Sequence, residues 1–393
     1  MESSAEVLLV FLRLGCTSFG GPIAHLGYFQ KEIVECRRWC SESTLAEIIA
    51  LAQSLPGPTS SQVGFALGIL RAGWLGGLAA WVGFTLPSAL LMLAYAYGHS
   101  FLTGNMGSNL LHGLQLVAVA VVAQAALTMQ RSLAPDRLRI AIAILATGVT
   151  LFGPPQVSTL IAITAGALAG LAFCRSEEPG EDTRPTLQLP RAAGAAAAAM
   201  FLLLLALPPF LAHYVSTPAL TVFSNFYRSG ALVFGGGHVV LPLLEETVVA
   251  RGWVTQQSFL AGYGAAQALP GPLFSFGAYL GAAVRPTPSP VLYGLLALVG
   301  IFTPGLLAMA AVLPFWSTLR QNRSIRAALR GINASVVGVL IAALFKPLWT
   351  TTIHSAGDFW VALVAFTLLT FWRIQPWFVV AGAAAAYVIT KSS

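Results

Sequence analysis

The sequence predicts an all-α membrane protein, a polytopic helical bundle with two inverted-topology repeats, and three observations support this fold class. Apolar residues make up 56% of the 393 residues and charged residues only 9%, whereas a soluble chain normally carries about 25% charged residues. Apolar runs of about 20 residues, enough for a helix to cross a bilayer, recur along the chain. The third observation is a long internal repeat, and duplicated, interrupted membrane segments are typical of transporters with a site between two halves.

Two motifs make up the repeat. The segment 11–21 (FLRLGCTSFGG) returns at 226–236 (FYRSGALVFGG), and we call this shift in numbering the first register. The segment 55–58 (LPGP) returns at 269–272, and we call this shift the second register; it also relates three single residues, Glu32, Trp39 and Gln53, to Glu246, Trp253 and Gln267. A single insertion or deletion separates the two registers. Glycine, proline, one arginine and one glutamine are therefore repeated within apolar surroundings, a pattern that indicates broken helices.

The predicted segments follow in order along the chain. The first half contains 8–27, 45–70, 73–98, 109–129, 138–153 and 156–174, and a polar linker and a connecting helix at 192–212 follow it. The second half contains 218–237, 257–283, 289–314, 330–349, 357–373 and 375–390. The predicted domains are thus 1–174, 175–217 and 218–393. Glycine and proline interrupt the first two segments of each half, which are either full spans or re-entrant.

The connecting helix predicts that the second half is upside down relative to the first. Six crossings return the chain to its starting side, and the connecting helix then carries it across. Cytoplasmic loops are enriched in Lys and Arg, and 13 of these residues fall on the N-terminal side against 5 on the other. We therefore expect a cytoplasmic N-terminus and a periplasmic C-terminus. The loop with Lys31, Arg37 and Arg38 is an exception, because it falls on the outer side of this topology.

An arginine occurs at the same place in both halves, as Arg13 and Arg228. An arginine at the centre of a bilayer costs roughly 2.5 kcal/mol or more, so such residues usually face a cavity or a partner. The alternative is that each side chain snorkels to the membrane interface. The duplication favours substrate binding, and the planar fork of guanidinium donors suits oxyanions.

The duplicated Gly-Gly breaks predict an anion site made by the backbone. A helix that restarts after Gly20-Gly21 or Gly235-Gly236 presents free N–H groups and a positive dipole end. The alternative is close helix packing by small residues. Because each break follows a duplicated arginine, we favour a binding site.

The duplicated Pro-Gly-Pro break is the other candidate for substrate binding. Two prolines around a glycine cannot continue a regular helix, so freed carbonyls and a new helix start need partners. Hydroxyl groups after the first break can cap the helix or hold a ligand oxygen, whereas only one serine remains after the second, so we expect asymmetric chemistry. The alternative is a structural kink. The candidates are Gln53, Pro56, Gly57, Pro58, Ser60, Ser61 and Gln62, with Gln267, Gly271 and Ser275 in the second half.

Titratable residues flank these breaks and are candidates for proton coupling: His25, Glu32, His238 and Glu246. Histidine titrates near neutral pH, although for each of the four we favour the alternative that it is an ordinary loop residue. The chain has no Gly-rich nucleotide-binding loop and no metal-ligand pattern, so we predict no cofactor and no metal. Nor is there an aromatic-interleaved basic face for nucleic acid.

At these motifs the sequence resembles the chromate ion transporter family in its long, two-domain form. The resemblance rests on FGGPIAHLG at 19–27, LPGP with SSQ within 55–62, GFTLPS at 83–88, FGGGH at 234–238 and LPGP at 269–272. It covers essentially the whole chain. The motif of the second half is looser, because its Pro-Gly-Pro lacks the following Thr-Ser-Ser.

The resemblance implies a bacterial inner-membrane protein that exports chromate, confers chromate resistance and uses the proton-motive force. Alternating access of two halves around one site is the mechanism that such repeats favour. The expected partners are chromate, the lipid bilayer and, through its equal shape and charge, sulfate; a homodimer is left open. The alternatives are a transporter of sulfate or another small anion, an anion channel, and a membrane-embedded enzyme. The scarcity of carboxylates within the segments argues against an enzyme.

Overall fold

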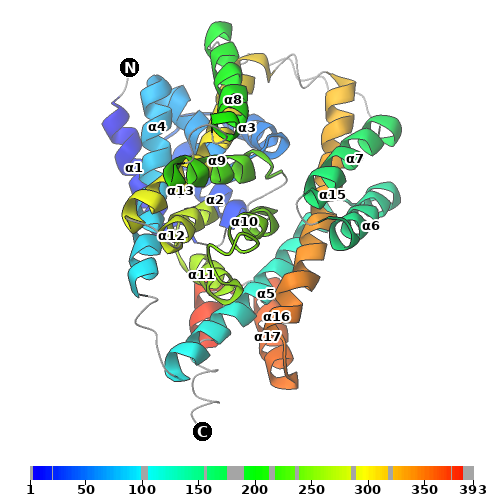
Figure 1. Ribbon diagram of the computed structural model, residues 1–393. Coiled ribbons are helices and arrows are strands. Elements are labelled where there is room, and N and C mark those ends of the chain that lie inside the picture. Colours follow the sequence, from blue (N-terminus) through cyan, green and yellow to red (C-terminus); the bar gives the residue numbers. More distant parts are fainter. Residues whose placement is uncertain are drawn as a thin grey trace.

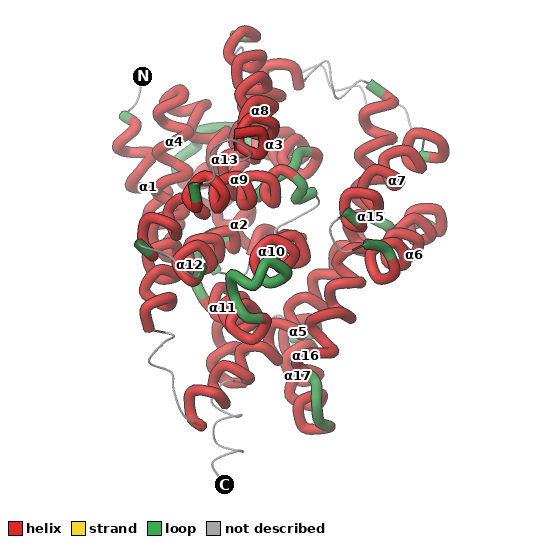
Figure 2. Tube along the Cα trace, viewed as in Figure 1, coloured by secondary structure: helices red, strands yellow, loops and turns green. Residues whose placement is uncertain are grey.

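The computed structural model describes residues 3–19, 21–98, 105–154, 157–174, 190–211, 217–234, 239–284, 289–316, 322–372 and 374–383. Every regular element within these ranges is a helix (Figure 2). Five helices of the described part of the chain are long and apolar enough to cross a membrane: Thr59–Gly98, His112–Leu133, Arg191–Pro208, Pro290–Phe315 and Arg323–Thr352. The expected all-α, multi-pass membrane fold is confirmed.

The helices of the first half come before the connecting helix α8 (Arg191–Leu211) in the chain (Figure 1). They are α1 (Ser4–Thr17), α2 (Gly21–Phe29) with a π-helical continuation (Gln30–Cys36), α3 (Glu42–Ser54), α4 (Thr59–Gly98), α5 (Asn105–Leu133), α6 (Arg137–Phe152) and α7 (Ser158–Phe173). Ser41 starts α3 by accepting a hydrogen bond from the Thr44 N–H at 3.2 Å, as a side-chain N-cap does.

The second half repeats this order. Its elements are α9 (Pro218–Ala231), α10 (Val240–Val248), α11 (Gln256–Ala268), a 3-10 turn (Leu273–Ser275), α12 (Phe276–Ala283), α13 (Pro290–Val312), α15 (Arg323–Ala343) with a π-helical continuation (Leu344–Trp349), α16 (Thr350–Thr352) and α17 (Ala356–Thr370). Thr255 caps α11 through the Ser258 N–H at 3.2 Å. Thr255 is the counterpart of Ser41 in the second register, so the cap is repeated along with the helix.

The first two segments of the first half are hairpins that return to the side on which they begin. Arg37, at the end of the first hairpin, donates to Glu6 near the start of α1 at 3.2 Å. Arg71 lies 3.9 Å from the same carboxylate. Since α4 kinks at Ala72 and Gly73, the part of α4 before the kink completes a second hairpin with α3. The expected segments 8–27 and 45–70 therefore fold as hairpins rather than as single straight helices.

The halves are interleaved through their later helices. The first-half helices α6 and α7 pack along the second-half helix α15, while α17 of the second half packs along α5 of the first. Small residues allow this contact: a Cβ atom added to Gly170 would lie 2.9 Å from the Gly331 backbone, as in small-residue packing of membrane helices. In Figure 1 α6, α7 and α15 form a group to the right of the hairpins.

Helix α1 packs on α4 through the same positions through which α9 packs on α13. A Cβ atom on Gly83 would lie 2.6 Å from the carbonyl oxygen of Leu8, and one on Gly300 would lie 3.0 Å from that of Phe223. Phe223 is the counterpart of Leu8 in the first register. The two halves thus share their packing as well as their sequence motifs.

Candidate functional site

The four helix breaks meet, and they do so reciprocally. The N–H group of Gly57, in the first Pro-Gly-Pro, donates to the Val233 carbonyl just before the second Gly-Gly break, at 2.7 Å. The N–H group of Gly271, in the second Pro-Gly-Pro, donates to the Ser18 carbonyl just before the first Gly-Gly break, at 2.8 Å. Each half therefore donates to the other from equivalent positions, which is the contact pattern of a two-fold relation. We call this meeting point the junction.

Glycine is required where the two Pro-Gly-Pro turns cross the other half. Gly57 has φ +123°, and a Cβ atom there would lie 2.5 Å from the Cα atom of Gly305. Gly271 has φ +95°, and its Cβ atom would lie 2.9 Å from the Ser88 hydroxyl oxygen. Positive φ strains any residue with a side chain. The repeated glycines thus allow backbone to approach backbone.

Buried polar side chains from the first half surround the junction. His25 Nδ1 lies 3.2 Å from Ser60 Oγ, and both residues are buried. Four polar atoms here are buried and, within the described part of the chain, unpartnered: Ser18 Oγ, His25 Nε2, Ser61 Oγ and Gln62 Oε1. Buried polar atoms normally have partners, so this cluster has the capacity to hold a polar ligand.

The start of α4 adds backbone donors to this cluster. The Gln62 N–H group makes the first bond of the helix, to Pro58. The amides of Thr59, Ser60 and Ser61 precede it and therefore have no acceptor within the helix. A helix start with free N–H groups and a positive dipole end favours an anion. Gln62 also clamps the turn, because its Nε2 donates to the carbonyls of Pro56 at 2.9 Å and Gly305 at 3.0 Å.

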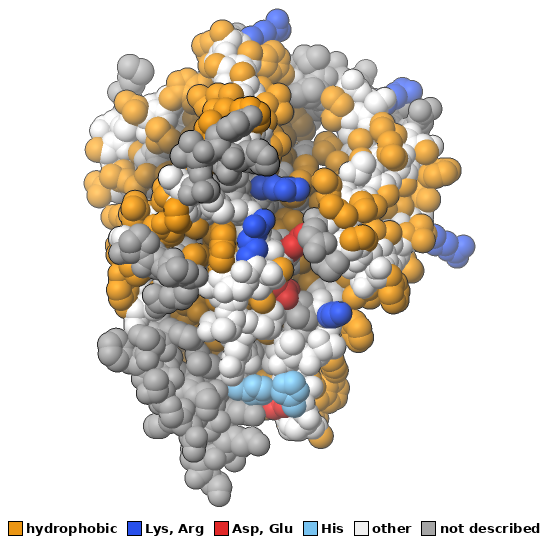
Figure 3. Space-filling model, viewed as in Figure 1, with side chains coloured by type: hydrophobic (Ala, Val, Ile, Leu, Met, Phe, Trp, Pro, Cys, Tyr) orange, Lys and Arg blue, Asp and Glu red, His pale blue; other side chains and the backbone are white. Residues whose placement is uncertain are grey.

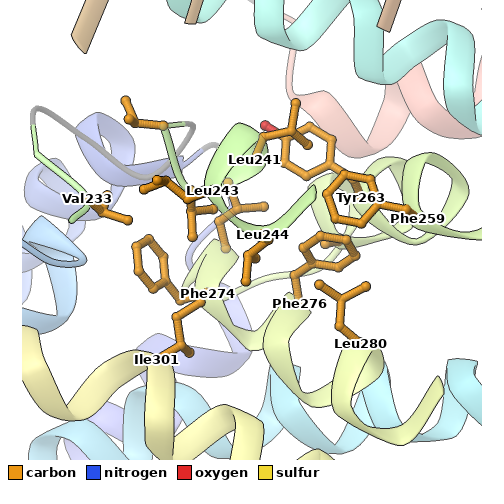
Figure 4. Close-up of a cluster of buried hydrophobic side chains, with 14 of the residues drawn as sticks. Val233, Leu241, Leu243, Leu244, Phe259, Tyr263, Phe274, Phe276, Leu280 and Ile301 are labelled. Atoms are coloured by element: carbon orange, nitrogen blue, oxygen red, sulfur yellow. The ribbon is translucent and has the colours of Figure 1, made fainter. Parts of the chain in front are cut away.

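The matching part of the second half is apolar. Phe274 and Phe276 stand where the first half has Ser60 and Gln62, and they pack with leucines of α10 (Figure 4). Ser275, the counterpart of Ser61, is buried. Side-chain donors for a ligand at the junction thus come mainly from the first half.

Arg228 lines a polar cavity of about 370 Å³ between α9, α10 and the start of α7. Arg251 and Glu246 line the same cavity, and Glu246 interacts electrostatically with both guanidinium groups. Figure 3 shows basic and acidic side chains gathered in the groove at the middle of this face. Two cations around a cavity of this volume can hold an anion at this position.

The remaining predicted residues lie in varied surroundings. Arg13 is exposed on α1, with no ion pair in the described part of the chain, and Gln53 is exposed, whereas Gln267 is partly buried. Glu32 pairs with Arg37 at 2.8 Å. Gly21 begins α2 with φ +78°. Gly20, Gly235, Gly236 and His238 lie outside the described residues.

Sequence reasoning missed Arg251 and the acceptor carbonyls of Ser18 and Val233. Arg251 carries a usable signal, because it is the counterpart of Arg37 in the second register, which also relates the other repeated residues. The carbonyls carry none, because every residue type has one.

Long apolar helices, hairpins broken at paired motifs, and buried donors where the hairpins meet define a polytopic membrane transporter. The chain belongs to the chromate transporter family, whose model matches residues 5–171 and 220–388. This membership makes it a transporter and not an enzyme.

The chain is similar to chromate transport proteins over most of its length. It is 31% identical to the chromate transport protein of Pseudomonas aeruginosa over 347 residues, which cover 86% of this chain and 79% of the relative. It is 27% identical to the probable chromate transport protein of Synechococcus elongatus, over 95% of this chain and 91% of the relative. The chromate transport protein of Cupriavidus metallidurans is 26% identical, with 96% and 91% covered. No solved structure matches the chain.

Proposed function

We propose that this protein exports chromate across the bacterial inner membrane by alternating access. The observation that carries the proposal is the junction, where helix breaks from the two repeated halves meet around buried, unpartnered polar atoms. The three relatives named above as chromate transport proteins support chromate as the substrate.

A tetrahedral dianion needs compensation at membrane depth, because burying a bare charge is prohibitive. The α4 amides and the hydroxyls of Ser60 and Ser61 supply neutral donors at the junction. Arg13 on α1 and Arg228 on α9 supply positive charge, each from the helix that ends just before the Gly-Gly break of its half. Gly20, Gly21, Gly235 and Gly236 complete the proposed binding set through their backbone.

An inverted arrangement of the halves supports alternating access, because rocking one half against the other then exposes a fixed site to each side in turn. The hairpins favour this topology. With the first two segments returning to their starting side, Lys31, Arg37 and Arg38 move to the cytoplasmic face and cease to be an exception to the charge pattern. The N-terminus is then cytoplasmic and the C-terminus periplasmic.

Export of a dianion is electrically favourable, since a negative-inside potential of 100 mV contributes roughly 4.6 kcal/mol. The proton-motive force adds a chemical gradient, with His25, Glu32, His238 and Glu246 as candidate proton carriers. Among them, His25 contacts Ser60, which belongs to the proposed substrate position.

Uptake of chromate into everted membrane vesicles tests this function. We expect saturable uptake that depends on the protein, rises when a pH gradient is imposed, and falls in the presence of sulfate if the site accepts both tetrahedral dianions. Vesicles that take up sulfate but not chromate would replace the proposal with a sulfate transporter. Flux that never saturates would indicate an anion channel.

A further inference from the structure

The repeat builds the same arginine and tryptophan contact in both halves. The Arg37 guanidinium lies 5.7 Å from the Trp39 ring centre, and the Arg251 guanidinium lies 5.8 Å from that of Trp253. Glu32 and Glu246 are also equivalent, in the same second register. The two arginine and tryptophan pairs are therefore copies of one cationic element, which follows α2 and its π-helical continuation in the first half and α10 in the second.

In the first half this element is neutralised. Arg37 contacts Glu32 at 2.8 Å and Glu6 at 3.2 Å, and Glu6 also lies 3.9 Å from Arg71. Two carboxylates thus face two guanidinium groups and leave no net charge for a ligand.

In the second half one carboxylate is missing. The counterpart of Glu6 in the first register is Thr221, and its hydroxyl donates to the Thr217 carbonyl at 3.2 Å. Among the described residues neither Arg228 nor Arg251 forms an ion pair with Glu246, although all three line the cavity of about 370 Å³. This volume corresponds to roughly a dozen water molecules at about 30 Å³ each. The cavity therefore holds two cations against one anion and has room for a ligand.

We propose that this cavity is a binding vestibule for a tetrahedral oxyanion, in which Arg228 receives the ion from the junction and Arg251 holds it before its release. The inference rests on the proposed function and deepens it, because it assigns a second anion position to one half of the protein alone. Arg251 is suited to hold the ion since its planar fork of donors lies against Trp253 beside the cavity. The ion-pair network around Glu6 is the closed counterpart of this vestibule on the other half.

Thr221 offers a substitution that closes the vestibule without touching its lining. Thr221 lies on α9 one turn before Asn225 and two turns before Arg228, on the same helix face. Thr221→Glu restores the carboxylate that Glu6 provides in the first half, so we expect it to pair with Arg251. Thr221→Gln has the same size without the charge and is the matched control.

Purified protein in lipid nanodiscs, titrated with chromate, tests the inference through Trp253. Chromate absorbs where tryptophan emits, so an ion beside Arg251 quenches the fluorescence of Trp253. The part of the quenching that is absent in Trp253→Phe measures occupancy of the vestibule. We expect Thr221→Glu and Arg251→Gln each to weaken this component about tenfold, and Thr221→Gln to leave it within about twofold. A monodisperse elution profile for each variant checks that it is folded.

The outcomes separate the vestibule from the transport proposal. If Thr221→Glu binds chromate as tightly as wild type while wild-type vesicles still take up chromate, the vestibule is wrong and the transport proposal stands. If wild-type vesicles take up no chromate, both fall. Loss of the Trp253 component in Thr221→Glu but not in Thr221→Gln supports the vestibule.

Discussion

Replacing Gly57 with alanine is expected to lower the initial rate of chromate uptake at least about 100-fold, because it disrupts the junction. At φ +123° a side chain adds strain of about 1–3 kcal/mol. The added Cβ atom would also lie 2.5 Å from the Cα atom of Gly305, so the two halves must separate. That separation breaks the hydrogen bond to the Val233 carbonyl and moves the α4 amides away from the substrate.

Gly73→Ala is the matched control for this substitution. Gly73 also has a positive φ, +66°, but a Cβ atom there meets nothing within 4 Å. We expect this variant to lose some thermal stability in detergent and to keep uptake within a few-fold of wild type. Equal uptake by Gly57→Ala and Gly73→Ala would show that the approach of Gly57 to Gly305 has no part in transport.

Replacing Arg228 with leucine is expected to reduce uptake about 100-fold, because the dianion loses one of its cationic partners on its path through the protein. The protein should still reach the membrane in normal amounts, since Arg228 lines a cavity and forms no ion pair with the described residues. Everted-vesicle uptake, normalised to the amount of protein on an immunoblot, measures the effect.

Arg13→Leu, the same change in the first half, is expected to abolish export in the same assay. Arg13 is exposed and forms no ion pair in the described part of the chain, so its loss should not disturb folding. Normal uptake by Arg13→Leu combined with loss in Arg228→Leu would confine the arginine function to the second half. Normal uptake by both variants would remove the repeated arginine from the binding site.

The sequence was informative about where the helices break and which breaks belong together. Glycine and proline at 20–21, 56–58 and 270–272 have conformational consequences that residue type alone predicts. Pairing the two copies of each motif then identified the regions that meet at the junction. The loss of hydroxyl side chains after the second Pro-Gly-Pro predicted asymmetric chemistry, and in the structure Phe274 and Phe276 pack in the apolar core there.

The sequence was less informative about how far each broken segment extends before it turns back, and about contacts between the halves. A segment such as 45–70 is long enough to span a bilayer, and the contacts of Arg71 with Glu6 and Trp39 show that it turns back. The hydrogen bonds from Gly57 and Gly271 end on backbone carbonyls, which leave no trace in residue type. The difference between Glu6 and Thr221 is visible in the sequence, but its meaning depends on knowing that Arg37 lies beside Glu6.

The opposed orientation of the two halves is most directly tested with two equivalent cysteines. Cys36 is exposed at the end of the first hairpin, and Ala250, its counterpart in the second register, is exposed at the end of the equivalent hairpin. Single-cysteine proteins, with Cys16, Cys40 and Cys174 changed to serine, would carry either native Cys36 or, with Cys36 also changed to serine, Ala250→Cys. A membrane-impermeant maleimide would be applied to intact cells and to everted vesicles. We predict labelling of Cys36 only in everted vesicles and of Ala250→Cys only in intact cells, whereas labelling of both from the same side would contradict the inverted arrangement.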